Sequence, residues 1–323
     1  MMTPAYAEPI SERLPLLYVT TAVLMLSTVS PITKNLLQYG DLSPFTLVCF
    51  RVLIAFACLF IMTMASPWQG LLQLTAKDVT QMALLGILGI GLAYAFASWA
   101  LVYTSVSHYC FIYSLHPTLT ALLSLVLGKE RASAVKIAGI ALSLCGCLYA
   151  LPDWLFDQEV GFGDLLVLLF TLSAATCVVL STGVVKRHGA TVTTTVMFGS
   201  SVVFLMLGLM FGETSWRLPA SFSSGLLLAY IGVATAAVFF LRNLSLRFLT
   251  PATVGAFHNL VPVFGILIAY LFLDEPITTH MLVGGAVVFT GVELVRRGSA
   301  DSPFIKETIV MPSTPTAPFP AGN

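Results

Sequence analysis

Charged residues are scarce in this chain of 323 residues. Asp, Glu, Lys and Arg make up 9% of the sequence, whereas soluble domains contain about 25%. Fifteen basic and fifteen acidic side chains cannot cover the surface of a soluble enzyme of this length. The formal net charge of zero and the lack of a basic patch exclude a nucleic-acid partner. The sequence is instead 57% hydrophobic, with a mean hydropathy of +0.93, which indicates a polytopic membrane protein.

Catalytic and metal-binding motifs are also missing. The six cysteines all fall inside apolar runs, at spacings that fit neither a zinc site nor a disulfide framework. The sequence contains no Gly-x-Ser-x-Gly, no His-Glu-x-x-His and no Cys–His pair at a plausible spacing. We therefore expect no enzymatic activity, no cofactor and no metal, and an intramembrane enzyme is the weaker alternative.

Ten apolar runs are long enough to be considered as membrane spans, since a bilayer core needs about 20 apolar residues per helix. The sequence therefore predicts an all-α protein of ten transmembrane helices. The runs are 14–33, 43–65, 79–101, 105–127, 133–151, 163–185, 191–211, 223–246, 251–272 and 278–296.

The basic residues between these runs predict the orientation. Eleven lie on the side of the N-terminus, and only Lys34 and Arg217 lie on the other side. Because short cytoplasmic loops carry the excess of Lys and Arg, both termini should be cytoplasmic. We expect the protein in a cell membrane, the inner membrane if it is bacterial, as a monomer or homodimer.

An internal repeat becomes visible when the chain is shifted by 145 residues, which aligns 100–150 with 245–295 without a gap. Matches that apolar composition does not explain include a proline, a glutamate and two glycines. The matched pairs are Pro117 and Pro262, Glu130 and Glu275, Gly139 and Gly284, and Gly146 and Gly291. Because five is an odd number of spans, the second copy of the unit enters the membrane from the side opposite to the first. The two copies therefore form an inverted repeat. Inverted repeats are a building plan of secondary transporters.

Two segments carry a recognisable pattern: a proline in one helix, a short loop centred on Leu-x-Glu, then a helix with spaced glycines. They are YSLHPTLTALLSLVLGKERASAVKIAGIALSLCG and HNLVPVFGILIAYLFLDEPITTHMLVGGAVVFTG. Both resemble the end of an EamA-type repeat of the drug/metabolite transporter superfamily. The resemblance implies ten helices and the export or exchange of small metabolites. The expected organisation is a cytoplasmic segment 1–13, repeats 14–151 and 163–297, an external linker 152–162 and a disordered cytoplasmic tail 298–323.

Several polar or small residues are predicted to be structural. Glu130 and Glu275 precede helix starts, where a carboxylate offsets the helix dipole. The four repeated glycines should allow close helix packing. We expect Arg51 to stabilise the second helix and Glu293 to pair with Arg296, Glu293 being taken as the only acid inside a span.

The candidate substrate site is a group of basic, amide and aromatic residues. Arg242 lies deep in the eighth run, where an unpaired charge facing lipid is costly, although it could also extend to the cytoplasmic end. Asn243 and Ser98 occupy matching positions of the repeat. His258 matches Tyr113, and each of these two residues lies four positions before a proline. The remaining candidates lie within a turn of these positions or on the aromatic side of the third run. They are Asn259, His116, Tyr109, Tyr94 and Trp99.

This group suits an anionic substrate. Amino acids or related carboxylated metabolites fit best, with phosphorylated compounds, nucleotide sugars or drugs as alternatives. A coupling proton could bind His108, His116 or His258, and the sequence does not decide among them.

Overall fold

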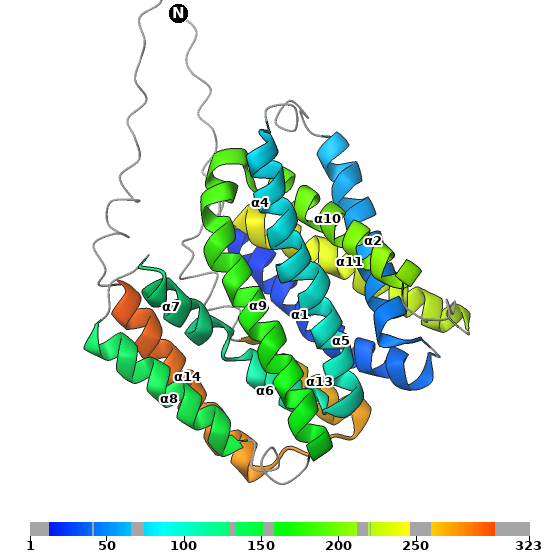
Figure 1. Cartoon of the computed structure of the whole chain (residues 1–323). Helices are drawn as coiled ribbons and strands as arrows, with labels where there is room; N and C mark the ends of the chain where they lie inside the picture. The colour runs from blue at the N-terminus through cyan, green and yellow to red at the C-terminus, as the bar shows by residue number, and fades with distance from the viewer. Residues whose placement is uncertain are drawn as a thin grey trace, which may run out of the picture.

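The computed structural model describes residues 13–40, 42–65, 74–128, 133–150, 158–211, 219, 221–245 and 260–300, which are helical and contain no strand (Figure 1). In chain order the helices are α1 (Arg13–Tyr39), α2 (Pro44–Met64), α4 (Ala76–Gly86), the π-helix η1 (Ile87–Leu92), α5 (Ala93–Tyr103), α6 (Val106–Tyr113), α7 (His116–Val126), α8 (Ala134–Ala150), α9 (Gln158–His188), α10 (Ala190–Phe211), α11 (Phe222–Ser245), α13 (Leu260–Leu273) and α14 (Thr279–Ala300). The first twelve residues, the tail from residue 301 and Glu130 lie outside the described residues.

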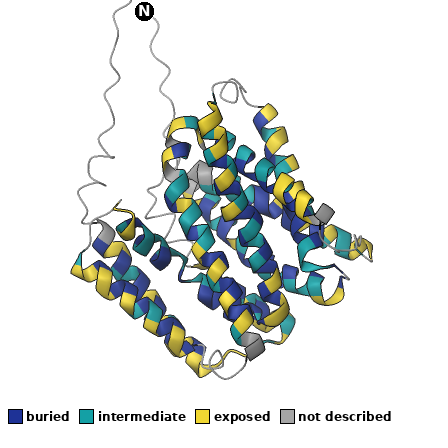
Figure 2. Cartoon of the chain, in the orientation of Figure 1, coloured by how far each residue is buried: buried dark blue, intermediate teal, exposed yellow. Residues whose placement is uncertain are grey.

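Seven helical stretches of the described chain are long and apolar enough to cross a membrane, and α8 and α13 are shorter apolar helices. Exposed positions run along the helices (Figure 2). They include large apolar side chains, such as Ile61 at 68%, Phe272 at 77% and Phe222 at 90% exposure. In water such surfaces would drive aggregation, but against lipid tails they are stable. The protein is therefore a multi-pass membrane protein.

Local capping fixes where several helices begin. The hydroxyl of Ser43 accepts a hydrogen bond from the backbone N–H of Thr46, at 3.2 Å, and Pro44 occupies the first turn of α2. The hydroxyl of Ser105 accepts from the N–H of His108, at 3.0 Å, at the start of α6. Each cap satisfies a backbone donor that the first turn leaves free.

Some helices extend beyond the expected apolar runs, and one run is divided. α1 continues to Tyr39, and α9 begins at Gln158, inside the segment 152–162 that was expected to be linker. The run 105–127 is divided into α6 and α7 by a turn at Ser114 and Leu115. This turn lies just before Pro117, which has no backbone N–H to donate within a helix.

Helices far apart in the sequence pack against one another. α1 packs against α11 and α13, and α9 packs against α5 and α7. α2 packs against α10 and α11. One apolar core forms around α5, α6 and α9, and another around α2 and α10.

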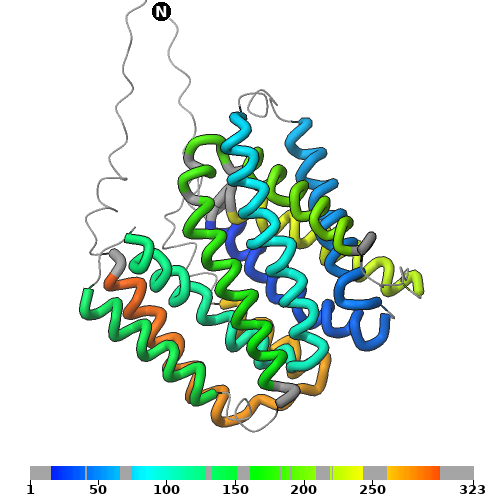
Figure 3. Tube along the Cα trace, viewed as in Figure 1, coloured from blue at the N-terminus to red at the C-terminus, as the bar shows by residue number. Residues whose placement is uncertain are grey.

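α8 and α14 lie side by side over their length (Figure 3). The repeated glycines meet at this contact. A Cβ on Gly139 would lie 2.7 Å from the carbonyl oxygen of Gly291, and one on Gly284 would lie 2.7 Å from that of Gly146. Since real Cβ contacts are longer, only glycine permits this separation of the two helix backbones.

Candidate functional site

Arg51 of α2 is buried, at 5% exposure, and lies between α5 and α11. Its Nε donates to the hydroxyl of Thr235, at 2.9 Å, and its guanidinium carbon lies 4.1 Å from the centroid of the Tyr94 ring. Cation–π contact of this kind partly replaces the hydration that a buried charge has lost. Arg51 thus joins a helix of the first half of the chain to one of the second.

Arg242 lies on the same face of α11 as the hydroxyl that binds Arg51. Thr235, Phe239 and Arg242 are spaced four and three residues apart, which places them along one side of a helix. The guanidinium carbon of Arg242 lies 4.6 Å from the centroid of the Phe239 ring. The two arginines therefore border one region of the bundle.

Next to Arg51 is a group of rings that we call the aromatic cluster: Tyr94, Tyr109, Tyr113, His116 and Phe170. Phe170 of α9 is its centre, stacked on Tyr109 at 5.7 Å and on Tyr113 at 5.6 Å between ring centroids. Tyr94 lies 6.4 Å from Phe170, and His116 lies 5.6 Å from Tyr113. Tyr94, Tyr113 and His116 are half-buried, and Tyr109 and Phe170 are buried.

The other candidates from the sequence are placed differently. Ser98 is buried, and its hydroxyl has no hydrogen-bond partner among the described residues. Trp99 is 43% exposed and stacks on Phe45, at 6.2 Å, so it is not part of the aromatic cluster. His258 and Asn259 lie outside the described residues. Asn243 belongs to α11, but the structure does not describe the placement of its side chain.

In the described part of the chain, no carboxylate pairs with either arginine. Asp78 contacts Arg187 and His188, and Glu275 accepts hydrogen bonds from backbone N–H groups at the start of α6. Glu293 pairs with Arg296, at 2.7 Å, which confirms the predicted ion pair. The positive charge of the two arginines is therefore without an acidic partner there.

The prediction that Glu293 is the only acid inside a span was wrong. Asp164 lies in α9, within the apolar stretch Gly161–Val185, and is fully buried. Its carboxylate accepts from the hydroxyl of Thr104, at 2.5 Å, and contacts Nδ1 of His108, at 3.0 Å. It therefore lies with polar groups at the α5–α6 turn and not with the arginines.

Comparison with known proteins decides the family. The sequence profile of the EamA-like transporter family matches residues 13–151 and again residues 161–297. The chain belongs to the EamA-like transporter family.

Relatives of this EamA-like transporter occur in bacteria and archaea. An uncharacterized transporter of Clostridium kluyveri is 24% identical over 85% of this chain and 90% of its own length. One of Archaeoglobus fulgidus is 26% identical over 79% of this chain and 88% of its own. A protein of known crystal structure superposes with a TM-score of 0.64 at 19% identity, over 89% of this chain and 98% of that one, which supports the fold. Family membership favours a membrane transporter over an intramembrane enzyme.

Two residues that contact the candidate site were not predicted from the sequence. Phe170 is one of 22 phenylalanines, and no motif distinguishes it. Thr235 is one of several threonines in apolar runs. Arg51 was predicted to be structural, although a charged residue in the middle of an apolar run was a signal for a site.

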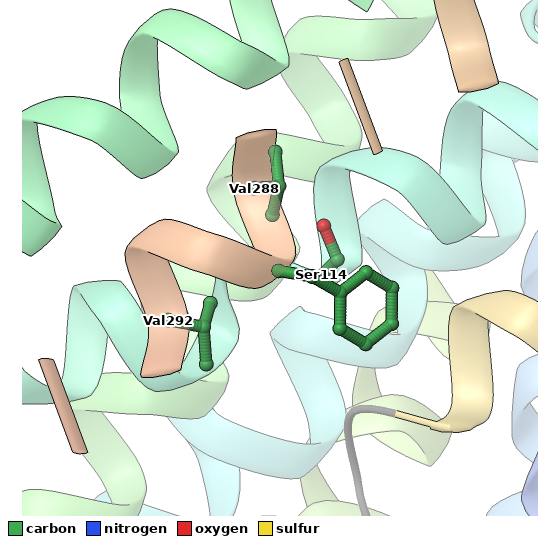
Figure 4. A pocket seen from close by; sticks show the side chains of 4 residues that line it. Ser114, Val288 and Val292 are labelled. Atoms are coloured by element: carbon green, nitrogen blue, oxygen red, sulfur yellow. The ribbon is translucent and has the colours of Figure 1, made fainter. Parts of the chain in front are cut away.

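A small pocket lies elsewhere, where the α6–α7 turn meets α14 (Figure 4). Ser114, Val288, Phe289 and Val292 line it. Its volume of about 10 Å³ is roughly what one water molecule needs. This pocket is too small for a metabolite.

Proposed function

We propose that this EamA-like transporter exports small carboxylated metabolites, best represented by amino acids, by alternating access between two inverted five-helix repeats. The arginines and the aromatic cluster form the substrate site. In this proposal both termini are cytoplasmic, and the first helix of each repeat is α1 or α9.

The pairing of helices supports the inverted repeat. If α1 corresponds to α9, α5 to α11 and α7 to α13, then the contacts of α1 with α11 and α13 match those of α9 with α5 and α7. The contacts of α2 with α10 and of α8 with α14 join corresponding helices. Exchanging the two halves leaves this set of contacts unchanged, as a two-fold relation requires.

The observation that carries the substrate class is the pair of guanidinium groups. Arg51 lies over Tyr94 of the aromatic cluster, and Arg242 lies on the side of α11 that carries Thr235, the partner of Arg51. No described carboxylate neutralises either arginine. A carboxylate binds a guanidinium through two parallel hydrogen bonds, and rings accommodate an apolar side chain beside it. The same observation favours phosphorylated compounds as the second candidate, since two guanidinium groups complement a phosphate better than one.

Transport by reconstituted vesicles of matched acids and amines tests the proposal. We use phenylalanine with phenethylamine, and leucine with isopentylamine, because each amine lacks only the carboxylate. Glucose 6-phosphate with glucose tests the second candidate. R242A should weaken transport of the acids by about 10- to 100-fold, corresponding to one charged hydrogen-bonding interaction of about 1.5–3 kcal/mol.

R242K should retain partial transport of the acids, because lysine keeps the charge but loses the planar fork. R296A is the matched control, since Arg296 is exposed and paired with Glu293 near the end of α14. If R242A reduced transport of the acids and of the amines equally, Arg242 would support the fold and not bind the ligand. Failure of the wild-type protein to transport any acid or phosphate would refute the substrate class.

A further inference from the structure

A second polar cluster lies at the α5–α6 turn, apart from the two arginines. Asp164 is completely buried, and both of its oxygens are engaged: one by the hydroxyl of Thr104 and the other by Nδ1 of His108. The Thr104 backbone carbonyl accepts from Nζ of Lys34, at 2.5 Å. The two oxygens of Glu275 each accept a backbone N–H of α6, from Val106 and Ser107, both at 2.8 Å.

These bonds cross between the two halves of the chain. His108 and Thr104 belong to the first half, whereas Asp164 and Glu275 belong to the second. The α5–α6 turn is therefore held to α9 and to the α13–α14 connection by side chains that carry charge. Separating the halves at this end requires these bonds to break.

The charge of the cluster depends on one proton. With a neutral imidazole, Lys34 contributes one positive charge, and Asp164 and Glu275 contribute two negative ones, so the cluster has a net charge of one negative. Protonation of His108 neutralises it. Burying a net charge is costly, and an imidazole is the side chain that gains or loses a proton near neutral pH. The four other titratable groups of this region are Lys34 of α1, Cys110 of α6, Cys147 of α8 and Glu275 of the α13–α14 connection.

We propose that the His108–Asp164 pair is the proton-binding site of this transporter, and that proton binding closes the end of the bundle at which the pair lies. The pair without net charge is stable where it is buried, as His108 and Asp164 are in this structure. The deprotonated cluster favours the hydrated, open arrangement. The proposal rests on alternating access as the proposed function, and it makes opening of this end depend on pH.

Thiol labelling without any substrate tests the proposal. Ser107 is buried at 1%, its hydroxyl has no partner among the described residues, and it adjoins His108, so S107C reports opening. I277C is the reference, because Ile277 is 37% exposed in the α13–α14 connection. Both variants in lipid nanodiscs are treated with a charged maleimide, and labelling of each site is measured by mass spectrometry.

The ratio of S107C to I277C labelling should rise with pH, because the pair loses its proton as the pH increases. Linkage to one proton limits the rise to about tenfold per pH unit. Two second-site variants should remove the pH response in opposite directions. H108Q leaves the cluster negative, so labelling should be high throughout. D164N leaves it without net charge when His108 is neutral, so labelling should be low at the high pH at which the wild type is labelled strongly.

H188Q is the matched control, because His188 lies 3.2 Å from Asp78 in the other described His–Asp pair, between α9 and α4. It should leave the wild-type response intact. A ratio that does not change with pH, or the same pH response with and without H108Q, would overturn the proposal. D164N remains informative if H108Q does not fold. Since no substrate is used, this outcome is independent of whether carboxylated compounds are transported.

Discussion

Gly284 and Gly285 are adjacent residues of α14 that should respond oppositely to alanine. A Cβ on Gly284 would lie 2.5 Å from the Cβ of Ala150 and 2.7 Å from the carbonyl oxygen of Gly146, both on α8. A Cβ on Gly285 would meet only the ring of Phe111, at 3.6 Å, which is an ordinary contact. The two variants add the same methyl group one residue apart.

G284A should destabilise the protein because α8 must move away from α14. The obstructing atoms are a neighbouring Cβ and a backbone oxygen, which no rotamer change can relieve. Overpacking of this kind costs about 1–3 kcal/mol, and alanine returns about 1 kcal/mol through its higher helix propensity. In G285A only the gain in helix propensity applies, so the stability of that variant should be unchanged or higher by up to about 1 kcal/mol.

Thermal unfolding in detergent, followed by loss of the monodisperse chromatographic peak, measures the difference. G284A should unfold several degrees below wild type, and G285A at or above it. A further variant, G146A, should behave like G284A because its Cβ would lie 2.9 Å from the backbone nitrogen of Val288. Equal midpoints for G284A and G285A would refute the view that glycine is required by the separation of α8 and α14.

Two further predictions concern a helix end and the orientation. E275Q removes one of the two acceptors that bind Val106 and Ser107, together with the charge, so stability should fall by about 1.5–3 kcal/mol while substrate affinity changes less than twofold. Normal thermal stability combined with poor binding would show that Glu275 acts on the ligand. A cysteine introduced at Gln158, the first residue of α9, should react with an impermeant reagent in intact cells. Protection of that cysteine would reverse the proposed orientation.

The positions of the helices could be predicted because a backbone in lipid must satisfy its hydrogen bonds within its own segment. The apolar runs therefore locate helices to within a few residues. Local departures from a continuous α-helix were harder to predict from the sequence. The division of α6 from α7 follows from Pro117, but the π-helix Ile87–Leu92 has no signal in hydropathy and lies within one apolar run.

The site was harder to predict because its residues are joined across long separations. Arg51 and Thr235 are 184 positions apart, and only the packing of α2 on α11 brings them together. Tyr94, Tyr109, Tyr113 and His116 were proposed from spacing and repeat position, and the structure places their rings together. Asp164 could have been noticed, since a carboxylate inside an apolar run is unusual, but its partner lies in another half of the chain.

The contacts of the two arginines also bear on release of the substrate. In the structure Arg51 lies over Tyr94 and Arg242 over Phe239, and each such cation–π contact is worth about 0.5–2 kcal/mol. A bound carboxylate would add a charged hydrogen-bonding interaction of about 1.5–3 kcal/mol. If binding an anion displaces part of the ring contact, the net gain per arginine is only about 1 kcal/mol. Moderate affinity of this size suits a transporter, because a substrate held more tightly would leave the site too slowly on the other side of the membrane.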